Sequence, residues 1–145
     1  MRSSPGAGLA NSMITIDTNL LVRLFIEDDA EQAAAARDEL ERAGGVVITA
    51  PVLCELAWVL RRYYRMPRDT LAAILDGLTR IPKARIDREA MDAGVAALRA
   101  GGDFADAVIA RLGEREGATV FVSFDRKAVR VLNGLGLASR APTTA

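Results

Sequence analysis

The 145-residue sequence contains no histidine and only one cysteine, Cys54. The absence of histidine excludes Ser–His–Asp and Cys–His triads, histidine acid–base pairs and histidine metal ligands. A single cysteine excludes an intramolecular disulfide and a cysteine-based zinc site. If the chain is an enzyme, carboxylates or lysines must therefore carry its chemistry.

Net charge and long apolar runs are also absent. Nineteen basic residues balance nineteen acidic ones, so the overall charge does not favour nucleic acid as a partner. No apolar run approaches the roughly 18–20 residues of a membrane span. Residues 1–12 lack the apolar core of a secretory signal, and we interpret them as a flexible leader. We expect a cytoplasmic protein without membrane contact.

What the sequence does contain is enough apolar material for one layered core, because half of its residues are hydrophobic. Apolar runs predict strands at 13–16, 46–48 and 119–123, and more weakly at 83–86. Helical patterns fill the intervals, at residues 18–27, 29–43, 49–64, 67–80, 87–100, 103–116 and 125–132. Strands that are apolar throughout and alternate with helices predict a parallel sheet covered on both faces. We therefore expect one α/β domain over residues 13–137, with a mainly parallel sheet of four to five strands and a flexible tail at 138–145.

Acidic residues occur next to the predicted strands. Asp17 ends the first strand, Asp125 follows the last one, and Asp103 and Asp106 open the helix before it. Parallel sheets bind ligands at the carboxyl ends of their strands, so these acids are expected to converge. Clustered carboxylates repel one another unless a cation neutralises them, and oxygen ligands suit Mg²⁺ or Mn²⁺.

Each acid also has an ordinary structural explanation. Asp17, Asp103 and Asp125 stand where helices begin, where aspartate is a common N-cap, and Asp106 could interact with the same helix dipole. Glu55 differs, because we place it on the apolar stripe of its helix rather than on the solvent side. Acids are rarely buried without a partner, so Glu55 favours function over capping.

Four segments in fixed order connect the chain to a known family: ITIDTNLLVR, TAPVLCELAWVL, DFADAVIARLG and TVFVSFDRKA. Together they resemble the PIN domain, and more narrowly the VapC-type toxins of bacterial toxin–antitoxin pairs. The resemblance covers residues 13–132. It implies a three-layer α/β/α fold and a metal-dependent ribonuclease that hydrolyses phosphodiesters of single-stranded RNA.

The resemblance also implies a role for each acid. Asp17, Glu55, Asp106 and Asp125 match the four PIN acids and are expected to be catalytic. Of these, Asp17, Asp106 and Asp125 are expected to bind Mg²⁺, or Mn²⁺ in its place. Glu55 is expected either to bind metal or to orient water. Asp103 belongs to a DFAD variant of the motif, and direct or water-mediated metal binding stays open for it.

Polar neighbours of these acids are expected to orient them. Thr18 and Asn19 complete the DTN motif after Asp17. Ser123 stands where the family usually has the threonine of a Thr-x-Asp pattern ending at Asp125, and it keeps the hydroxyl.

An RNA backbone can reach an acidic pocket only along basic side chains. Arg126 and Lys127 directly follow a predicted ligand and are expected to bind substrate, and Arg23 on the first helix is a further candidate. The run RRYYR at residues 61–65 has two open interpretations. It is either a surface that stacks bases and binds phosphates, or a solvated helix end or subunit contact.

A VapC-like toxin implies two protein partners. The chain is expected to form a homodimer and to be inhibited by a small VapB-like antitoxin that inserts a segment, often with an arginine, into the acidic site. Apolar faces of the second to fourth helices are the expected contact surface.

Two other function classes require residues that this sequence lacks. A receiver-like signalling domain needs an acidic pair after the first strand, whereas Asp17 has no acidic neighbour. A haloacid-dehalogenase-type phosphatase needs DxDxT, whereas Asp17-Thr18-Asn19 lacks the second aspartate. A housekeeping PIN nuclease without an antitoxin and an inactive PIN-fold binding module stay open.

Overall fold

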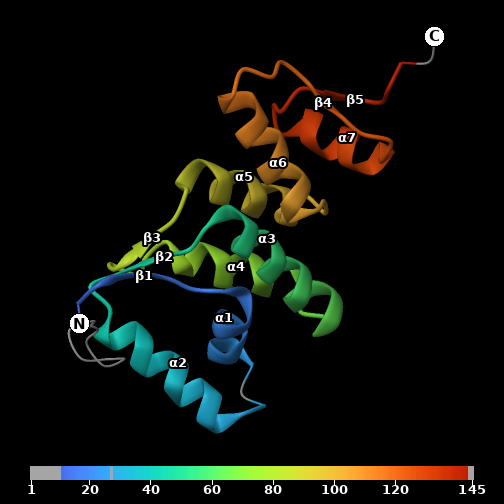
Figure 1. Ribbon diagram of the computed structural model, residues 1–145. Helices are drawn as coiled ribbons and strands as arrows, with labels where there is room; N and C mark the ends of the chain where they lie inside the picture. Colours follow the sequence, from blue (N-terminus) through green and yellow to red (C-terminus); the bar gives the residue numbers. More distant parts are fainter. Residues whose placement is uncertain (1–10, 27, 144–145) are drawn as a thin grey trace.

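The computed structural model describes residues 11–26 and 28–143, in which short strands alternate with helices (Figure 1). The first part of the chain contains β1 (Met13–Thr15), α1 (Thr18–Phe25), α2 (Ala30–Arg42), β2 (Gly45–Val47), α3 (Ala50–Trp58), the π-helical turn η1 (Val59–Tyr63), α4 (Arg68–Leu78) and β3 (Ala84–Arg85). The second part contains α5 (Arg88–Arg99), α6 (Phe104–Arg115), β4 (Phe121–Val122), α7 (Arg126–Gly134) and β5 (Ser139–Arg140). The predicted alternation of strands and helices is thus confirmed, and most of the expected leader lies outside the described residues.

The strands pair in parallel, as predicted, but they form two sheets instead of one. The order is β1-β2-β3 in the first sheet and β4-β5 in the second. Figure 1 shows the second sheet and α7 at the opposite end of the molecule from the first, with α5 and α6 between them. The described strands have only two or three residues each, so few ladder hydrogen bonds oppose this separation.

The expected C-terminal tail contributes a strand. Asn133 at the end of α7 binds the backbone of Ser139 twice: its amide nitrogen donates to the carbonyl oxygen at 2.9 Å and its amide oxygen accepts from the N–H at 2.8 Å. These two bonds hold β5 against α7, and backbone bonds from Phe121 to Ala138 and from Ser123 to Arg140 pair it with β4, so the fold extends beyond residue 137.

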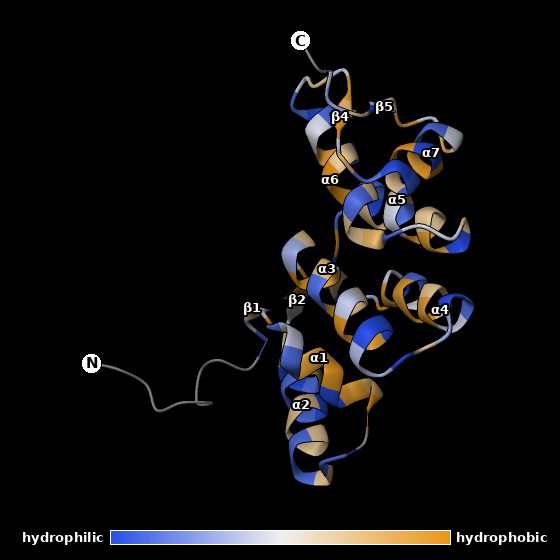
Figure 2. Ribbon diagram, turned by 90° about the vertical axis from the view of Figure 1, so that its right-hand side faces the viewer, coloured by the Kyte–Doolittle hydropathy of each residue, from blue (hydrophilic) through white to orange (hydrophobic). Residues whose placement is uncertain are grey.

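The helices bury apolar stripes in two cores of unequal size. The larger core joins the first sheet to α1, α3, α4, α5 and α6 and contains Leu53, Leu56, Leu60, Leu71 and Phe104. The smaller core lies beneath the second sheet and consists mainly of alanine, with two leucines. Along the helices, hydrophobic and hydrophilic residues alternate in patches (Figure 2), as amphipathic packing requires. Within residues 11–26 and 28–143, no helix combines the length and apolarity that crossing a bilayer requires.

The helices α5 and α6 hold the two parts of the molecule together, and a glycine permits their close approach. Gly94 in α5 packs directly against the buried ring of Phe104 at the start of α6, where a Cβ atom would overlap the ring. The position of α6 matters because Asp103 and Asp106 stand at its beginning.

We predict that Gly94→Ala destabilises the fold by about 1–3 kcal/mol, because the added methyl group overpacks this contact. The free energy of unfolding in urea measures the effect. Gly77→Ala is the matched control: it lies in α4 with nothing within 4 Å of the added Cβ, and it should leave stability unchanged or raise it by up to about 1 kcal/mol. Equal behaviour of the two variants would contradict the contact.

Candidate active site

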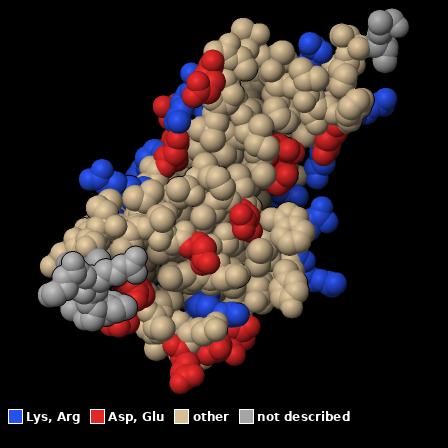
Figure 3. All heavy atoms as spheres, in the orientation of Figure 1, with Lys and Arg blue, Asp and Glu red and all other residues tan. Residues whose placement is uncertain are grey.

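A polar pocket of about 830 Å³ lies between the end of α3 with η1 and the beginnings of α6 and α7. Its charged and aromatic lining residues are Trp58, Arg61, Arg62, Arg65, Arg68, Asp103, Phe104, Asp106, Asp125 and Lys127. The pocket therefore has an acidic wall from the second part of the chain and a mainly basic wall from the first. Figure 3 shows one face of the molecule, where acidic side chains lie across the middle and several basic side chains lie along the right-hand edge, while the two kinds are mixed at the upper left.

Two of the three acids in the pocket are helix caps. The carboxylate of Asp125 accepts hydrogen bonds from the backbone of Lys127 at 3.0 Å and of Ala128 at 3.1 Å. The Asp103 carboxylate accepts a longer one, of 3.4 Å, from the N–H of Ala105. The hydroxyl oxygen of Ser123 accepts from the N–H of Asp125 at 3.0 Å, so it fixes the backbone of this acid. Both acids remain exposed, and capping leaves each a free oxygen.

Asp106 is the acid that has no capping bond in the described structure. It is partly buried, and burial is the main cause that raises the pKa of its carboxyl above the usual range. The negative charges of Asp103 and Asp125 raise it further. Asp106 thus lies close enough to Asp103 and Asp125 for their charges to disfavour its ionised form.

Asp17 and Glu55 belong to a second acidic group, outside the pocket lining. Asp17 caps α1 by accepting from the N–H of Leu20 at 3.1 Å. The buried Thr18 donates its hydroxyl to Glu55 Oε2 at 3.1 Å and thereby ties α1 to α3. The expected position of Glu55 on the apolar stripe is wrong: its side chain is exposed. The buried face of this segment is formed by Leu53, Leu56, Ala57 and Leu60.

Cys54 lies between the two acidic groups. Burial, followed by the negative charges of Asp103 and Glu55, raises the pKa of its thiol to about 11. This thiol was not among the predicted site residues, and only the position of α3 against α6 brings it there.

The structure separates the predicted substrate-binding cations. Lys127 lines the pocket, whereas Arg126 and Arg23 are not among its described lining residues. Arg23 instead binds Asp28 and Gln32, each at 2.6 Å. Asn19, predicted to orient Asp17, is exposed.

Arg68 and Trp58 line the pocket but were not among the predicted site residues. Arg68 donates to the carbonyl oxygen of Gly102 at 2.5 Å and thus connects α4 to the loop before α6. Trp58 lines the pocket with a side chain that is 62% exposed. A lone aromatic in an apolar run resembles core sequence, so the pattern gave no sign of this exposure.

Comparison with known proteins identifies the family. The PIN domain family model matches residues 14–132, which contain all five acids described above. The chain belongs to the PIN domain family. PIN domains are generally nucleases that use divalent metal ions, and PIN nucleases bind RNA. No curated protein matches the chain.

The donor chemistry of this PIN domain suits a hard divalent cation, because every acid offers carboxylate oxygens and no histidine is present. The acids are too far apart to form a metal site in this structure: within the part of the chain that the structure describes, no three acids are arranged to hold one ion. The reason is the divided sheet. Asp17 follows β1 and Asp125 follows β4, and these two strands do not pair.

We predict that Asp106→Asn raises the melting temperature of the metal-free PIN domain at neutral pH. Because folding raises the pKa of this carboxyl, its charged form opposes folding. The protein therefore loses stability as the pH rises through that pKa. The gain should shrink as the pH falls toward and below the usual range of an aspartate carboxyl, where this carboxyl becomes neutral. Thermal unfolding in EDTA over a pH series measures it.

The control for this prediction is Asp69→Asn. Asp69 is an exposed acid in the first turn of α4, and its loss should not raise the melting temperature. The proposed repulsion would be contradicted if Asp106→Asn did not raise the melting temperature at neutral pH, or if the increase did not change with pH.

Proposed function

We propose that this PIN domain is a Mg²⁺-dependent endoribonuclease that cleaves single-stranded RNA, with Mn²⁺ able to replace Mg²⁺. The observation that carries the proposal is one pocket with opposite charges on its two walls. Three carboxylates on one side offer ligands for a divalent cation. Four arginines on the other side, together with Lys127 next to Asp125, offer contacts for a phosphate backbone.

The proposed roles combine the contacts of these residues with the four-acid PIN pattern that the sequence resembles. Asp106, Asp103, Asp125 and Asp17 would hold the metal, which supplies Lewis-acid polarisation of the phosphate and a more acidic water. Glu55 would orient the attacking water, and its hydrogen bond from Thr18 limits the directions in which its carboxylate can point. Ser123 would orient Asp125 through the backbone, and Lys127 would contact a phosphate.

We predict cleavage of single-stranded RNA in Mg²⁺ or Mn²⁺, abolished by EDTA. Asp17→Asn and Asp106→Asn should each lower the rate at least about 100-fold, because an amide is a poor substitute for an anionic ligand. Asparagine can still cap a helix, so Asp17→Asn should fold normally. Gel-resolved cleavage of a labelled oligonucleotide measures the rate.

Asp28→Asn is the matched control, because Asp28 pairs with Arg23 outside the pocket. Its cleavage rate should equal that of the unmodified protein. Full activity in Asp106→Asn would remove the proposed role of the acids, and no cleavage under any metal condition would leave the PIN-fold binding module as the better description.

We further propose that this nuclease is the toxin of a VapBC-type pair and is inhibited by a small antitoxin. A second pocket, of about 370 Å³, supports a protein partner: it lies between α1, α2, α4 and the first sheet. Its lining is apolar except for Lys83, which donates to the carbonyl oxygens of Leu40 and Glu41. Such a surface accepts the apolar side chains of a bound helix or strand.

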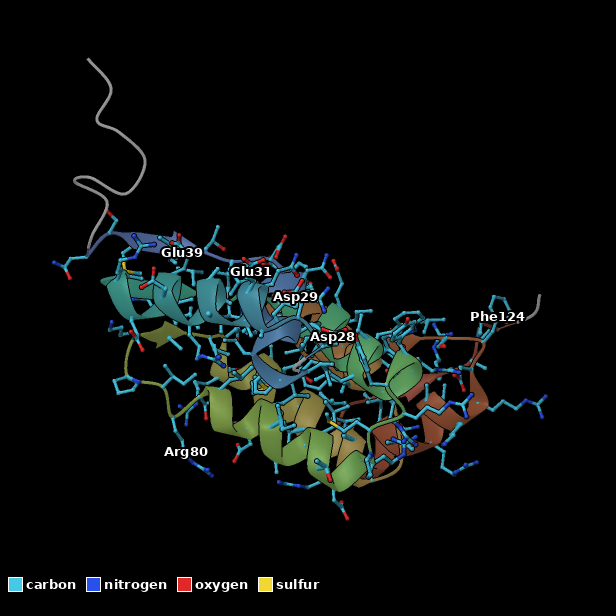
Figure 4. All side chains as sticks on the ribbon, turned by 90° about the horizontal axis from the view of Figure 1, so that it is seen from below. Asp28, Asp29, Glu31, Glu39, Arg80 and Phe124 are labelled. Carbon is cyan, nitrogen blue, oxygen red and sulfur yellow. The ribbon has the colours of Figure 1, made fainter. Side chains whose placement is uncertain are left out.

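A homodimer is part of the same proposal. Three large hydrophobic side chains at the far end of the molecule are exposed: Ile109, Val122 and Phe124, the last of them 88% exposed. Phe124 projects from the end of the molecule in Figure 4. Ile109 and Val122 line one pocket, and exposed apolar groups that lie together are typical of surfaces that another chain covers. A second copy of this chain is the proposed partner.

We predict that expression of the chain arrests cell growth, and that co-expression of the product of a small adjacent reading frame restores it. Asp106→Asn should not arrest growth, because the proposed toxicity is RNA cleavage. Colony counts after induction measure the effect. Cleavage in vitro without growth arrest, together with an isolated gene, would instead favour a housekeeping PIN nuclease.

A further inference from the structure

Trp58 is the only tryptophan of the chain, and its place is unusual for so apolar a side chain. It ends α3 on the lining of the charged pocket and is 62% exposed, although its neighbours Ala57 and Leu60 are buried. A tryptophan in this position forgoes most of the free energy that its burial would provide. Its flat face is therefore available to a ligand in the pocket.

Two arginines beside Trp58 have no partner in the described structure. Arg62 and Arg65 line the same pocket and are exposed, and neither side chain takes part in a hydrogen bond or ion pair among the described residues. Their neighbours behave differently: Arg61 donates to the carbonyl oxygen of Met66 at 3.0 Å, and Arg68 is bound to Gly102. Arg61 and Arg68 thus build the pocket wall, whereas Arg62 and Arg65 leave their donors free.

The backbone that carries these side chains is itself irregular. The turn η1 is π-helical, where a continuous α-helix was expected, and Arg65 has a φ of 55°. A left-handed conformation costs energy for a residue with a Cβ atom, and glycine would adopt it more readily. Trp58, Arg62 and Arg65 nevertheless line one pocket, which Asp106 lines as well.

We propose that Trp58, Arg62 and Arg65 form a subsite that binds one unpaired nucleotide of the substrate, with its base stacked on the indole and its phosphates on the arginines. The subsite rests on the proposed nuclease function and specifies how that function selects its substrate. A base inside a duplex is already stacked on both faces, so only an unpaired base can bind the indole. The adjacent phosphate then lies toward the acidic wall.

The proposal predicts how strongly single-stranded RNA binds in EDTA, where no cleavage occurs. Trp58→Ala should weaken binding of a fluorescently labelled oligonucleotide about tenfold, whereas Trp58→Phe should retain most of the affinity. Fluorescence anisotropy measures the dissociation constant. Tyr63→Ala is the matched control and should bind normally, because Tyr63 is 74% exposed on η1 but does not line the pocket.

The arginines are tested through the salt dependence of the same binding. Arg62→Ala and Arg65→Gly should each weaken binding and lower the slope of affinity against salt by about one phosphate contact. The glycine variant also relieves the strained backbone, so it should fold at least as well as the unmodified chain. Arg80→Ala is the control, because Arg80 pairs with Asp76 at 2.9 Å and does not line the pocket.

An abasic oligonucleotide and an acidic peptide separate the possible ligands. The effect of Trp58→Ala should vanish with the abasic strand, because that strand has no base to stack. Three results would each overturn the subsite: an equal loss of RNA affinity in Trp58→Ala and Tyr63→Ala, an affinity for duplex RNA equal to that for single-stranded RNA, or tighter binding of polyglutamate than of RNA.

The subsite and the nuclease function can be refuted separately. If the protein binds RNA but does not cleave it in Mg²⁺, only the nuclease function is refuted. If Trp58→Ala cleaves RNA as fast as the unmodified protein, only the subsite is refuted.

Discussion

Burial of one face of α3 and η1 determines where every functional group around it can point. Leu53, Leu56 and Leu60 are completely inaccessible and fix the rotation of this segment in the centre of the larger core. With that face fixed, Glu55 meets the hydroxyl of Thr18 and Trp58 meets the polar pocket. A helix turned by one residue would bury Glu55 or Cys54 in apolar surroundings, at a cost that unpaired polar groups impose.

The features that could be predicted from the sequence are local ones. Asp17, Asp103 and Asp125 accept hydrogen bonds from N–H groups two or three residues ahead. Their capping role therefore depends only on residues that are close in sequence. The parallel pairing of strands also followed from short apolar runs between helices. The side of a strand or helix that faces the core is harder to predict where both sides are apolar, as around Glu55, and the pattern there gave the wrong face.

The joint geometry of the acids was beyond prediction because it depends on pairing between distant strands. The runs at β1 and β4 are too short to specify a register, and nothing in them indicates whether they share a sheet. Net charge was equally uninformative. The net charge of the chain is zero, although acids and cations are separated within one pocket. Such a separation creates a local electric field that net charge does not indicate.

The protonated state of Cys54 has a consequence for metal selectivity. A thiol with a pKa of about 11 carries almost no thiolate in neutral solution, and thiolate is the form that binds soft metals and reacts with oxidants. Burial of Cys54, and after it the charges of Asp103 and Glu55, thus suppress the thiolate that could attract zinc or copper to this region. Near Cys54, a cation would therefore be bound by carboxylate oxygens and not by the sulfur atom.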